Sequence, residues 1–326
     1  MIPSQPDSPA LFPVTIAAAA PVARDIVQFE LRAMNGLDLP PFEAGAHIPV
    51  RTPSGAMRQY SLCGAPSDQS RYLIAVKREA AGRGGSASMV DTLQVGATLQ
   101  IGAPVNQFPL DERARSFLLI AGGIGITPML SMALALTEEG SRRFRLIYLT
   151  RDRDATAFLE QLASPELKSS VTVHHDGGDP DRAFDLWPLL EKPGSVNGQH
   201  LYCCGPTGLM DAVRDMSGHW PASAVHFESF GADTAPRADD RAFTVHCSKS
   251  AVEFEVPVGR SILEIARSHG IAIPSSCESG TCGSCKTVLL SGDADHRDLV
   301  LMPEERENRI MVCVSRAQSD RLELDL

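Results

Sequence analysis

The spacing of hydrophobic and polar residues changes twice along the chain, so three segments predict three different architectures. From about residue 14 to residue 109, short runs of alternating apolar and polar residues are separated by Gly and Pro. An alternation with a period of two indicates strands that bury one face. Such runs occur at residues 25–33, 46–52, 59–64 and 72–78. Several short strands of this kind favour an antiparallel β-barrel.

The middle segment has longer, continuously apolar runs. The first covers residues 116–136 and has glycines in its middle, and others follow at 143–150, 171–175 and 200–205. Strand runs without alternation are typical of strands buried on both faces, and here helical stretches lie between them. This order of elements predicts an α/β domain with a parallel sheet covered by helices.

One apolar stretch raises the question of a membrane span. Residues 117–137 carry no charged side chain and are long enough to cross a bilayer. Gly122, Gly123, Gly125 and Pro128 interrupt the stretch in its middle. A buried strand, a glycine turn and a helix explain this pattern better than a membrane helix does.

The last segment follows a stretch rich in Ala, Asp, Gly and Pro at residues 231–242, which is typical of a linker. The next runs, at 242–248 and 251–259, predict a hairpin, and residues 261–270 predict a short helix. We therefore expect a multidomain protein. Its predicted parts are a barrel domain at 1–112, an α/β domain at 113–230, a linker at 231–240 and a compact domain at 241–326.

Composition and charge limit the classes of partner. A chain of 326 residues with 43% hydrophobic and 21% charged residues is typical of a globular protein with two or three domains. A formal net charge of −10 argues against nucleic acid or an anionic membrane as the partner. The first 13 residues lack a secretory pattern, and the eight cysteines then indicate a reducing, cytoplasmic environment.

Four of the cysteines have the spacing of a redox cluster site. Cys277, Cys282 and Cys285 follow the order C-x4-C-x2-C, and Cys313 comes much later. This is the spacing of plant-type [2Fe–2S] ferredoxins. Serines and glycines fill the loop, and glycine permits the positive φ angles that a tight wrap requires. Structural zinc usually takes two close ligand pairs and disulfide frameworks suit small secreted domains, so both alternatives are weaker.

A glycine turn in the middle segment is a candidate nucleotide site. Gly122, Gly123 and Gly125 come where a strand should lead into a helix, and glycines there let the backbone approach a pyrophosphate. The pattern departs from G-x-G-x-x-G, and glycines at such a turn also serve packing alone. A second turn, Cys204-Gly205-Pro206, ends a later strand of the same predicted sheet. Because ligands bind at the carboxyl ends of such strands, the two turns together favour a dinucleotide.

Two strings in the first segment are candidate cofactor contacts. Arg58, Tyr60 and Ser61 place a cation, a ring and a hydroxyl on or beside one strand. Residues 77–86 then bring cations and glycines before a predicted helix, which is suited to a terminal phosphate. An ordinary strand and a flexible hairpin tip are the competing interpretations.

Two further groups leave alternatives open. Arg151 and Arg153 follow the strand at 143–150, where basic residues suit the 2′-phosphate of NADPH. His174, His175 and Asp176 look like part of a metal site. Further ligands are missing, so solvated loop residues or dinucleotide neighbours are the preferred interpretation.

Taken in order, these strings resemble the phthalate dioxygenase reductase family over essentially the whole chain. The resemblance is carried by RQYSLC, VKREAAGRGGS, AGGIGITPML, YCCGPTGLMDAVRDM, HFESFGA and SSCESGTCGSCKT. It implies an FMN-binding β-barrel, an NAD domain of ferredoxin–NADP reductase type and a C-terminal plant-type ferredoxin of α+β, β-grasp fold.

The resemblance also implies roles for individual residues. Thr127, Cys204 and Phe230 would act at the flavin and nicotinamide, with Phe230 stacking on the flavin until nicotinamide displaces it. The implied metal ligands are Cys277, Cys282, Cys285 and Cys313. The implied cofactor-binding residues are Arg58, Tyr60, Ser61, Ala75, Val76, Lys77, Gly82, Gly84, Gly85, Ser86, Gly122, Gly123, Gly125, Gly205 and Pro206.

These cofactors would work in series. NADH gives up two electrons together, an iron–sulfur cluster accepts one at a time, and a flavin joins the two kinds of chemistry. The resemblance implies an NADH-dependent oxidoreductase, a monomer that passes electrons through FMN and the cluster to the Rieske oxygenase of an aromatic-degradation system. Two alternatives stay open: the reductase of a related oxygenase such as an O-demethylase, and a redox sensor or electron-carrier module without turnover.

Overall fold

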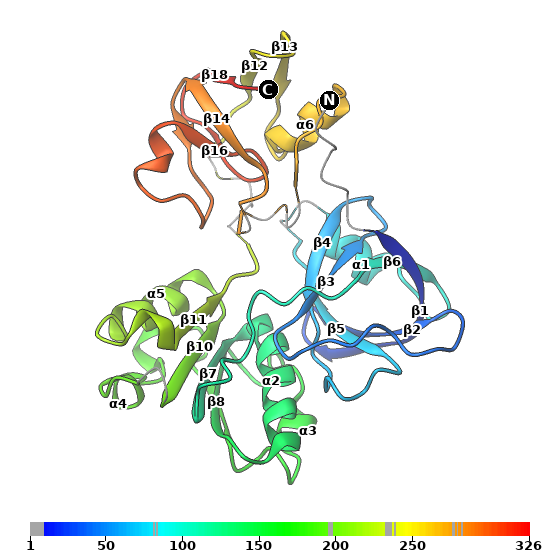
Figure 1. The fold of residues 1–326 in the computed structure, drawn as a ribbon, viewed down its shortest axis with the longest axis vertical. Helices are drawn as coiled ribbons and strands as arrows, with labels where there is room; N and C mark the ends of the chain where they lie inside the picture. Colours follow the sequence, from blue (N-terminus) through cyan, green and yellow to red (C-terminus); the bar gives the residue numbers. More distant parts are fainter. Residues whose placement is uncertain are drawn as a thin grey trace.

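The computed structural model describes residues 10–80, 82, 84–194, 198–231, 237, 239–275, 278, 280–281 and 283–326. In these residues, the strands form a six-stranded sheet, two five-stranded sheets and a short two-stranded ribbon. Figure 1 shows the three large sheets as separate bodies, with the last one above the other two. Each large sheet lies inside one of the three predicted ranges, while the exact domain boundaries stay a prediction.

The first sheet is an antiparallel barrel with strand order β4-β3-β6-β1-β2-β5. A bridge between Leu62 and Ile74 joins the region after β4 to β5 and closes the barrel. Alternate residues such as Val14, Ile16 and Phe29 fill its interior. The elements of this domain are β1 (Leu11–Ala23), β2 (Ile26–Ala33), β3 (His47–Arg51), β4 (Met57–Ser61), β5 (Tyr72–Lys77), α1 (Gly85–Thr92) and β6 (Thr98–Gly102).

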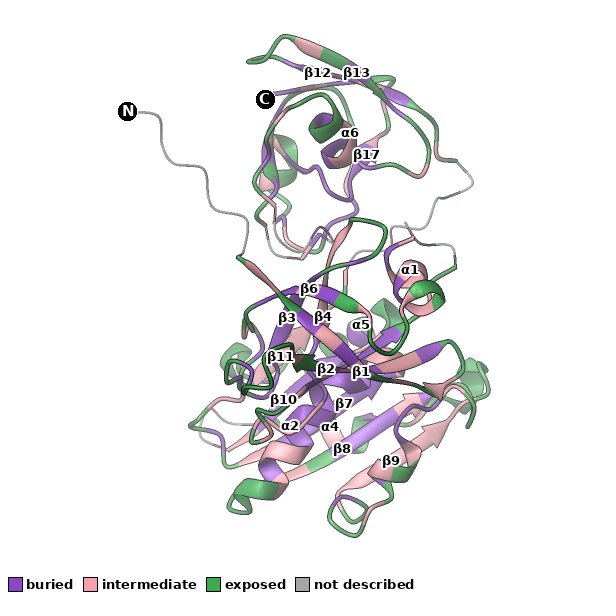
Figure 2. Cartoon of the chain, turned by 90° about the vertical axis from the view of Figure 1, so that its right-hand side faces the viewer, coloured by how far each residue is buried: buried purple, intermediate pink, exposed green. Residues whose placement is uncertain are grey.

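The second sheet is parallel throughout, with strand order β11-β10-β7-β8-β9. Its strands are β7 (Ser116–Gly122), β8 (Arg143–Thr150), β9 (Val171–His175), β10 (Gln199–Cys204) and β11 (Val225–Glu228). Figure 2 shows that β7, at the centre of the sheet, is buried along most of its length. Its helical elements are η1 (Gly123–Gly125), α2 (Ile126–Glu139), α3 (Leu159–Leu162), η2 (Pro180–Arg182), α4 (Trp187–Leu190), α5 (Thr207–Met216) and η3 (Ala222–Ala224).

The structure shows which elements the long apolar stretch forms. Residues 117–137 consist of β7, the 3-10 turn η1 and most of α2, so the predicted strand, glycine turn and helix are confirmed. α2 packs against one face of the sheet, where Met129 and Leu136 contact Leu119 and Leu146 in one core. Among the described residues, none of the helices has both the length and the apolar character of a membrane span.

The third sheet is mixed, with strand order β13-β12-β18-β14-β16, and β12 and β18 run parallel. Helix α6 begins with a capping box, in which Ser261 and Glu264 bond each other's backbone N–H groups. The elements are β12 (Phe243–Cys247), β13 (Val252–Val256), α6 (Ile262–Ser268), β14 (Lys286–Ser291), β15 (Ala294–Asp295), η4 (Glu305–Glu307), β16 (Arg309–Met311), β17 (Arg316–Ala317) and β18 (Arg321–Leu324).

Buried polar contacts hold the connections between the domains. The Tyr202 hydroxyl in β10 donates to the Pro109 carbonyl at 2.9 Å and accepts from the Asp111 N–H at 2.8 Å. This fixes the connection from the barrel to the parallel sheet. At the other connection, Asp240 forms an ion pair with Arg297, and both side chains are almost fully buried. The segment entering the third domain is therefore anchored before β12 begins.

Candidate functional site

The carboxyl edge of the parallel sheet faces the barrel, and the predicted site residues of both domains meet there. Cys204 at the end of β10 lies beside Ala121 of β7 and Glu228 of β11 in the strand register. Across the junction, the Ser61 hydroxyl at the end of β4 donates to Glu228 Oε2 at 3.5 Å. β5 of the barrel also contacts η1. The barrel and the sheet therefore share one candidate site.

The glycines of this edge divide into two kinds. A Cβ on Gly125 would lie 2.1 Å from the Cys204 carbonyl oxygen, and one on Gly122 would lie 2.7 Å from Pro206 Cδ. These two glycines, with Gly205, let the two turns pack against each other. Gly123 differs, because it has a φ of +52° and a Cβ there would meet nothing within 4 Å. Gly122 and Gly125 therefore serve packing, whereas Gly123 opens onto free space and stays a candidate for contact with a pyrophosphate.

The start of α1 and Arg58 form the second part of the site. Gly84 precedes the helix with a φ of 81°, and none of the described side chains caps the helix N-terminus. A Cβ on Gly85 would lie 2.9 Å from Arg58 Nε, so the guanidinium lies directly over the first turn. A guanidinium and uncapped helix N–H groups together favour an anion. The fold therefore brings together the two strings that the sequence suggested separately.

The rest of the predicted flavin contacts line β4 and β5. The buried Tyr60 hydroxyl has no hydrogen-bond partner in the described part of the chain. Burial raises the pKa of Tyr60 to about 12, so this phenol is a neutral donor at physiological pH. Ala75 and Val76 are buried, so only their backbone could contact a ligand, while Lys77 is exposed and pairs with Glu79. The orphaned Tyr60 donor fits a bound polar group.

The three predicted catalytic residues occupy different environments. Thr127 is buried in the first turn of α2, and its hydroxyl donates to the Ile124 carbonyl at 3.1 Å. Burial, together with the nearby Glu228 carboxyl, raises the pKa of the Cys204 thiol well above its ordinary value. Cys204 is therefore a neutral thiol. Phe230, two residues after β11, is 43% exposed and free of the core.

Glu228 is a site residue that the sequence did not reveal. Burial raises the pKa of its carboxyl to about 8, against a smaller opposing effect of the Ser61 hydrogen bond. The carboxyl is therefore mostly protonated at neutral pH. A Glu at the end of a strand gives no signal by itself, because its desolvation depends on residues distant in the chain, such as Ser61 of the barrel.

The cysteine loop lies in the third domain. Cys285 and Cys313 are both buried, while Cys277 and Cys282 lie outside the described residues. Gly280 and Gly283 have φ angles of 77° and 79°, which confirms the expected positive φ of the loop glycines. Two of the predicted ligands are thus buried near a loop whose backbone has the expected conformation.

An ion pair joins this loop to the barrel. Glu278 lies 3.7 Å from the Arg58 guanidinium through Oε2 and 2.6 Å from the Arg267 guanidinium through Oε1. The Arg58 and Glu278 side chains are only 17% and 7% exposed. Arg58 therefore contacts both the anion-favouring turn of α1 and the cysteine loop. Sequence reasoning assigned Arg58 to the flavin alone and gave Glu278 no role.

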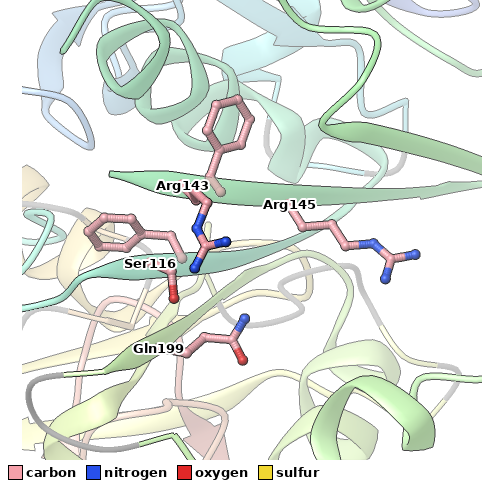
Figure 3. A pocket seen from close by; sticks show the side chains of 6 residues that line it. Ser116, Arg143, Arg145 and Gln199 are labelled. Carbon is pink, nitrogen blue, oxygen red and sulfur yellow. The ribbon is translucent and has the colours of Figure 1, made fainter. Parts of the chain in front are cut away.

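A shallow pocket of about 260 Å³ lies at the opposite edge of the parallel sheet. Figure 3 shows Ser116, Arg143 and Gln199, the first residues of β7, β8 and β10, along its wall. It opens at the amino ends of the strands, whereas the glycine turns lie at the carboxyl ends. The pocket is therefore separate from the candidate cofactor site.

The structure bears on the two alternatives left open by the sequence, a metal site at His174 and His175 and a 2′-phosphate site at Arg151 and Arg153. His175 bonds the Thr150 hydroxyl at 2.9 Å and His174 bonds the Arg182 carbonyl at 2.8 Å, so both rings have protein partners. Arg151 and Arg153 follow β8 at the carboxyl edge and are exposed. Within the described ranges, no acidic partner accompanies either guanidinium. They stay candidates for contact with a 2′-phosphate.

Comparisons with known proteins agree with this geometry. Residues 245–318 match the family of 2Fe-2S iron-sulfur cluster binding domains, and residues 119–215 match the oxidoreductase NAD-binding domain family. The chain is 57% identical to phthalate dioxygenase reductase of Burkholderia cepacia, over 95% of this chain and 96% of that protein. The chain belongs to the phthalate dioxygenase reductase family.

Two further similarities extend this assignment. The phthalate 4,5-dioxygenase oxygenase reductase subunit of Pseudomonas putida is 50% identical over 95% of each chain. A solved phthalate dioxygenase reductase, described as a modular structure for electron transfer from pyridine nucleotides to [2Fe-2S], has a TM-score of 0.90 and 55% identity. The match covers 97% of this chain and 98% of that one.

These findings confirm the predicted family and the multidomain fold class. They also confirm that the chain is an oxidoreductase of this reductase family, with an NAD-binding domain and a [2Fe–2S] domain. The roles given to individual site residues stay predictions.

Proposed function

We propose that this reductase takes electrons from NADH through FMN to its [2Fe–2S] cluster and delivers them, as a monomer, to a terminal Rieske oxygenase that acts on an aromatic substrate such as phthalate. The observation that carries the proposal is the meeting of three domains at one site. Ser61 joins the barrel to Glu228 of the parallel sheet, and Arg58 joins the barrel to Glu278 of the cysteine loop.

The barrel residues fit a flavin mononucleotide. When bound, a flavin accepts hydride and releases electrons singly. The chain supplies a phosphate site at Arg58 and the uncapped first turn of α1, where Gly82, Gly84, Gly85 and Ser86 follow one another. The Tyr60 phenol, neutral and without a described partner, supplies a hydrogen-bond donor beside it.

The sheet edge fits a dinucleotide. Gly123 leaves the backbone open to an approaching pyrophosphate, and no side chain caps the N-terminus of α2 that follows. Gly205 and Pro206 form the neighbouring turn, packed against Gly122. The exposed Phe230 ring is free to stack on a flat cofactor and to leave it. These residues bind and orient the dinucleotide, and none is required as a nucleophile.

Glu228 places a carboxyl that can hold a proton at the carboxyl edge of the parallel sheet. Its carboxyl keeps a proton up to a pH near 8 and lies within reach of the Ser61 hydroxyl. A neutral carboxyl and a neutral Cys204 thiol add no negative charge at the ends of β10 and β11. The absence of charge on these two groups favours the approach of an anionic dinucleotide.

The test is anaerobic reduction of the purified holoenzyme. We expect about one FMN and two irons per chain, and NADH should bleach the flavin and the cluster bands together. Reconstituted turnover with a phthalate-type Rieske oxygenase should follow, with a higher kcat/KM for NADH than for NADPH. A preference for NADPH would assign Arg151 and Arg153 to a 2′-phosphate. A cluster that stays oxidised while the flavin is reduced would refute the relay.

A further inference from the structure

A short apolar segment, residues 299–302, lies against the cysteine loop and faces solvent. The Leu299 N–H donates to the Gly280 carbonyl at 3.0 Å, and Val300 Cγ1 lies 3.5 Å from where a Cβ on Gly283 would be. Gly280 and Gly283 lie inside the C-x4-C-x2-C loop. The side chains of Leu299 and Met302 are nevertheless 49% and 61% exposed. Two large apolar side chains thus stand in water beside the cluster ligands.

The segment is held in this position by a buried carboxylate. The Asp298 side chain is fully buried, and its Oδ2 accepts from the N–H groups of Val300 at 3.1 Å and Leu301 at 2.8 Å. Leu301, which lies between the exposed Leu299 and Met302 in the chain, is buried in the core of the third domain. Leu299 and Met302 are therefore exposed because the hydrogen bonds to Asp298 and the burial of Leu301 fix the conformation of this turn.

The position of the segment distinguishes it from other exposed apolar residues. Single exposed apolar side chains are normal on protein surfaces, and Val258 after β13 is one example. Leu299 and Met302 instead lie on one turn that contacts the loop of the redox centre. A different contact of that loop is made inside the molecule, where Glu278 faces Arg58 of the barrel. The segment at 299–302 is thus a second, solvent-facing contact of the same loop.

We infer that Leu299 and Met302 form the contact surface for the protein that accepts electrons from the cluster, a terminal oxygenase with an apolar patch beside its own metal centre. This inference rests on the proposed function. One electron passes from the reduced cluster to the oxidised metal of the partner, and no bond forms or breaks. Met is enriched in the buried centres of interfaces, and small transient interfaces are usual for electron transfer.

The charges around the segment agree with an apolar contact. Glu305 pairs with Lys286, and the exposed Glu304 and Glu307 lie beside Arg306 in the chain. In the described part of this surface, charges of both signs therefore lie near the two apolar side chains. Binding of the partner should therefore depend only weakly on salt.

The experiment compares the holoenzyme with a Leu299→Ser/Met302→Gln double variant. The matched control is Val258→Ser, which removes a 47% exposed apolar side chain from the same domain. We expect the double variant to bind a Rieske oxygenase about tenfold more weakly by calorimetry, with a raised KM for the oxygenase. NADH-dependent reduction of ferricyanide, the EPR spectrum of the cluster and the unfolding temperature should match the wild type. The control should match the wild type in every measurement.

Three results would overturn the inference in different ways. If the double variant binds the oxygenase as tightly as the wild type does, the surface is wrong and the proposed function stands. If the wild type itself neither binds nor reduces any Rieske oxygenase, the proposed acceptor is wrong and the surface falls with it. If the wild type forms a dimer in ultracentrifugation that the double variant does not form, the surface is a contact between two copies of this chain.

Discussion

Two of the described neighbours of the cysteine loop differ in chemistry. On the side of the barrel, Glu278 is nearly buried and ion-paired with Arg58 and Arg267. On the side of solvent, the loop contacts an apolar segment with Leu299 and Met302 exposed. A buried ion pair holds its two side chains in one arrangement, and removing either side chain is strongly destabilising. Exposed apolar side chains instead suit a transient contact with another protein. The comparison indicates a permanent contact toward the electron source and a temporary one toward the acceptor.

The largest expected effect comes from Glu278→Gln, which neutralises the inner contact and leaves two guanidiniums without a carboxylate. We expect the internal transfer to the cluster to slow by at least about tenfold, since truncating one partner of a buried charge pair costs about 2–5 kcal/mol. Stopped-flow absorbance of the holoenzyme after mixing with NADH measures this step. Reduction of the flavin itself should keep its wild-type rate.

Lys286→Gln is the control for that prediction, because Lys286 pairs with Glu305 on the surface of the same domain. Its removal should change little, as exposed ion pairs contribute about 0–1 kcal/mol. Iron content and the EPR spectrum of both variants show whether the cluster is intact. Equal rates for the two variants, with intact clusters, would remove the distinction between the inner and outer contacts.

A smaller effect is expected from Asp298→Ala, which releases the outer segment without touching its apolar side chains. The N–H groups of Val300 and Leu301 lose their acceptor, at a cost of about 1–3 kcal/mol for groups left unsatisfied. We expect faster hydrogen exchange at residues 299–302 and a few-fold weaker binding of the oxygenase. Unchanged exchange in this segment would show that the turn does not depend on Asp298.

A further effect concerns pH and the contact between the barrel and the parallel sheet. Glu228 has a raised pKa of about 8 in the folded protein. Between its ordinary pKa and pH 8, the unfolded chain loses this proton while the folded protein keeps it, so stability falls as pH rises through that window. Glu228→Gln should flatten this fall. Unfolding temperatures at pH 5.5 and pH 8.5 measure it, and an equal slope for the variant and the wild type would contradict the raised pKa.

Local patterns in the sequence accounted for the elements and for part of the site. Alternating runs predicted the barrel strands, continuous runs predicted the parallel sheet, and the glycines at 122–125 predicted a turn between β7 and α2. The spacing of Cys277, Cys282, Cys285 and Cys313 indicated the cluster, in agreement with the matched 2Fe-2S domain. Apart from the distant Cys313, these predictions depend on residues that lie close together in the chain, and this is why they succeeded.

The residues that sequence reasoning missed depend on distant partners. Glu228 is half-buried, desolvation raises the pKa of its carboxyl, and its contact Ser61 in the barrel lies 167 residues away. Glu278 has a role because Arg58 of another domain reaches it. Arg58 itself contacts both Gly85 of α1 and Glu278 of the cysteine loop. The sequence alone shows neither how far a charged residue is buried nor which residue it pairs with.

The sequence by itself determined the order of the strands and helices and the kind of metal centre. These follow from hydrophobic periodicity, the placement of glycines and the spacing of the cysteines, which can all be read along the chain. The pKa of a carboxyl, the pairing of two domains and the exposure of Leu299 and Met302 depend on how separate segments pack and exclude water. Only the folded arrangement decides these, because desolvation and ion pairing are set by distances in space.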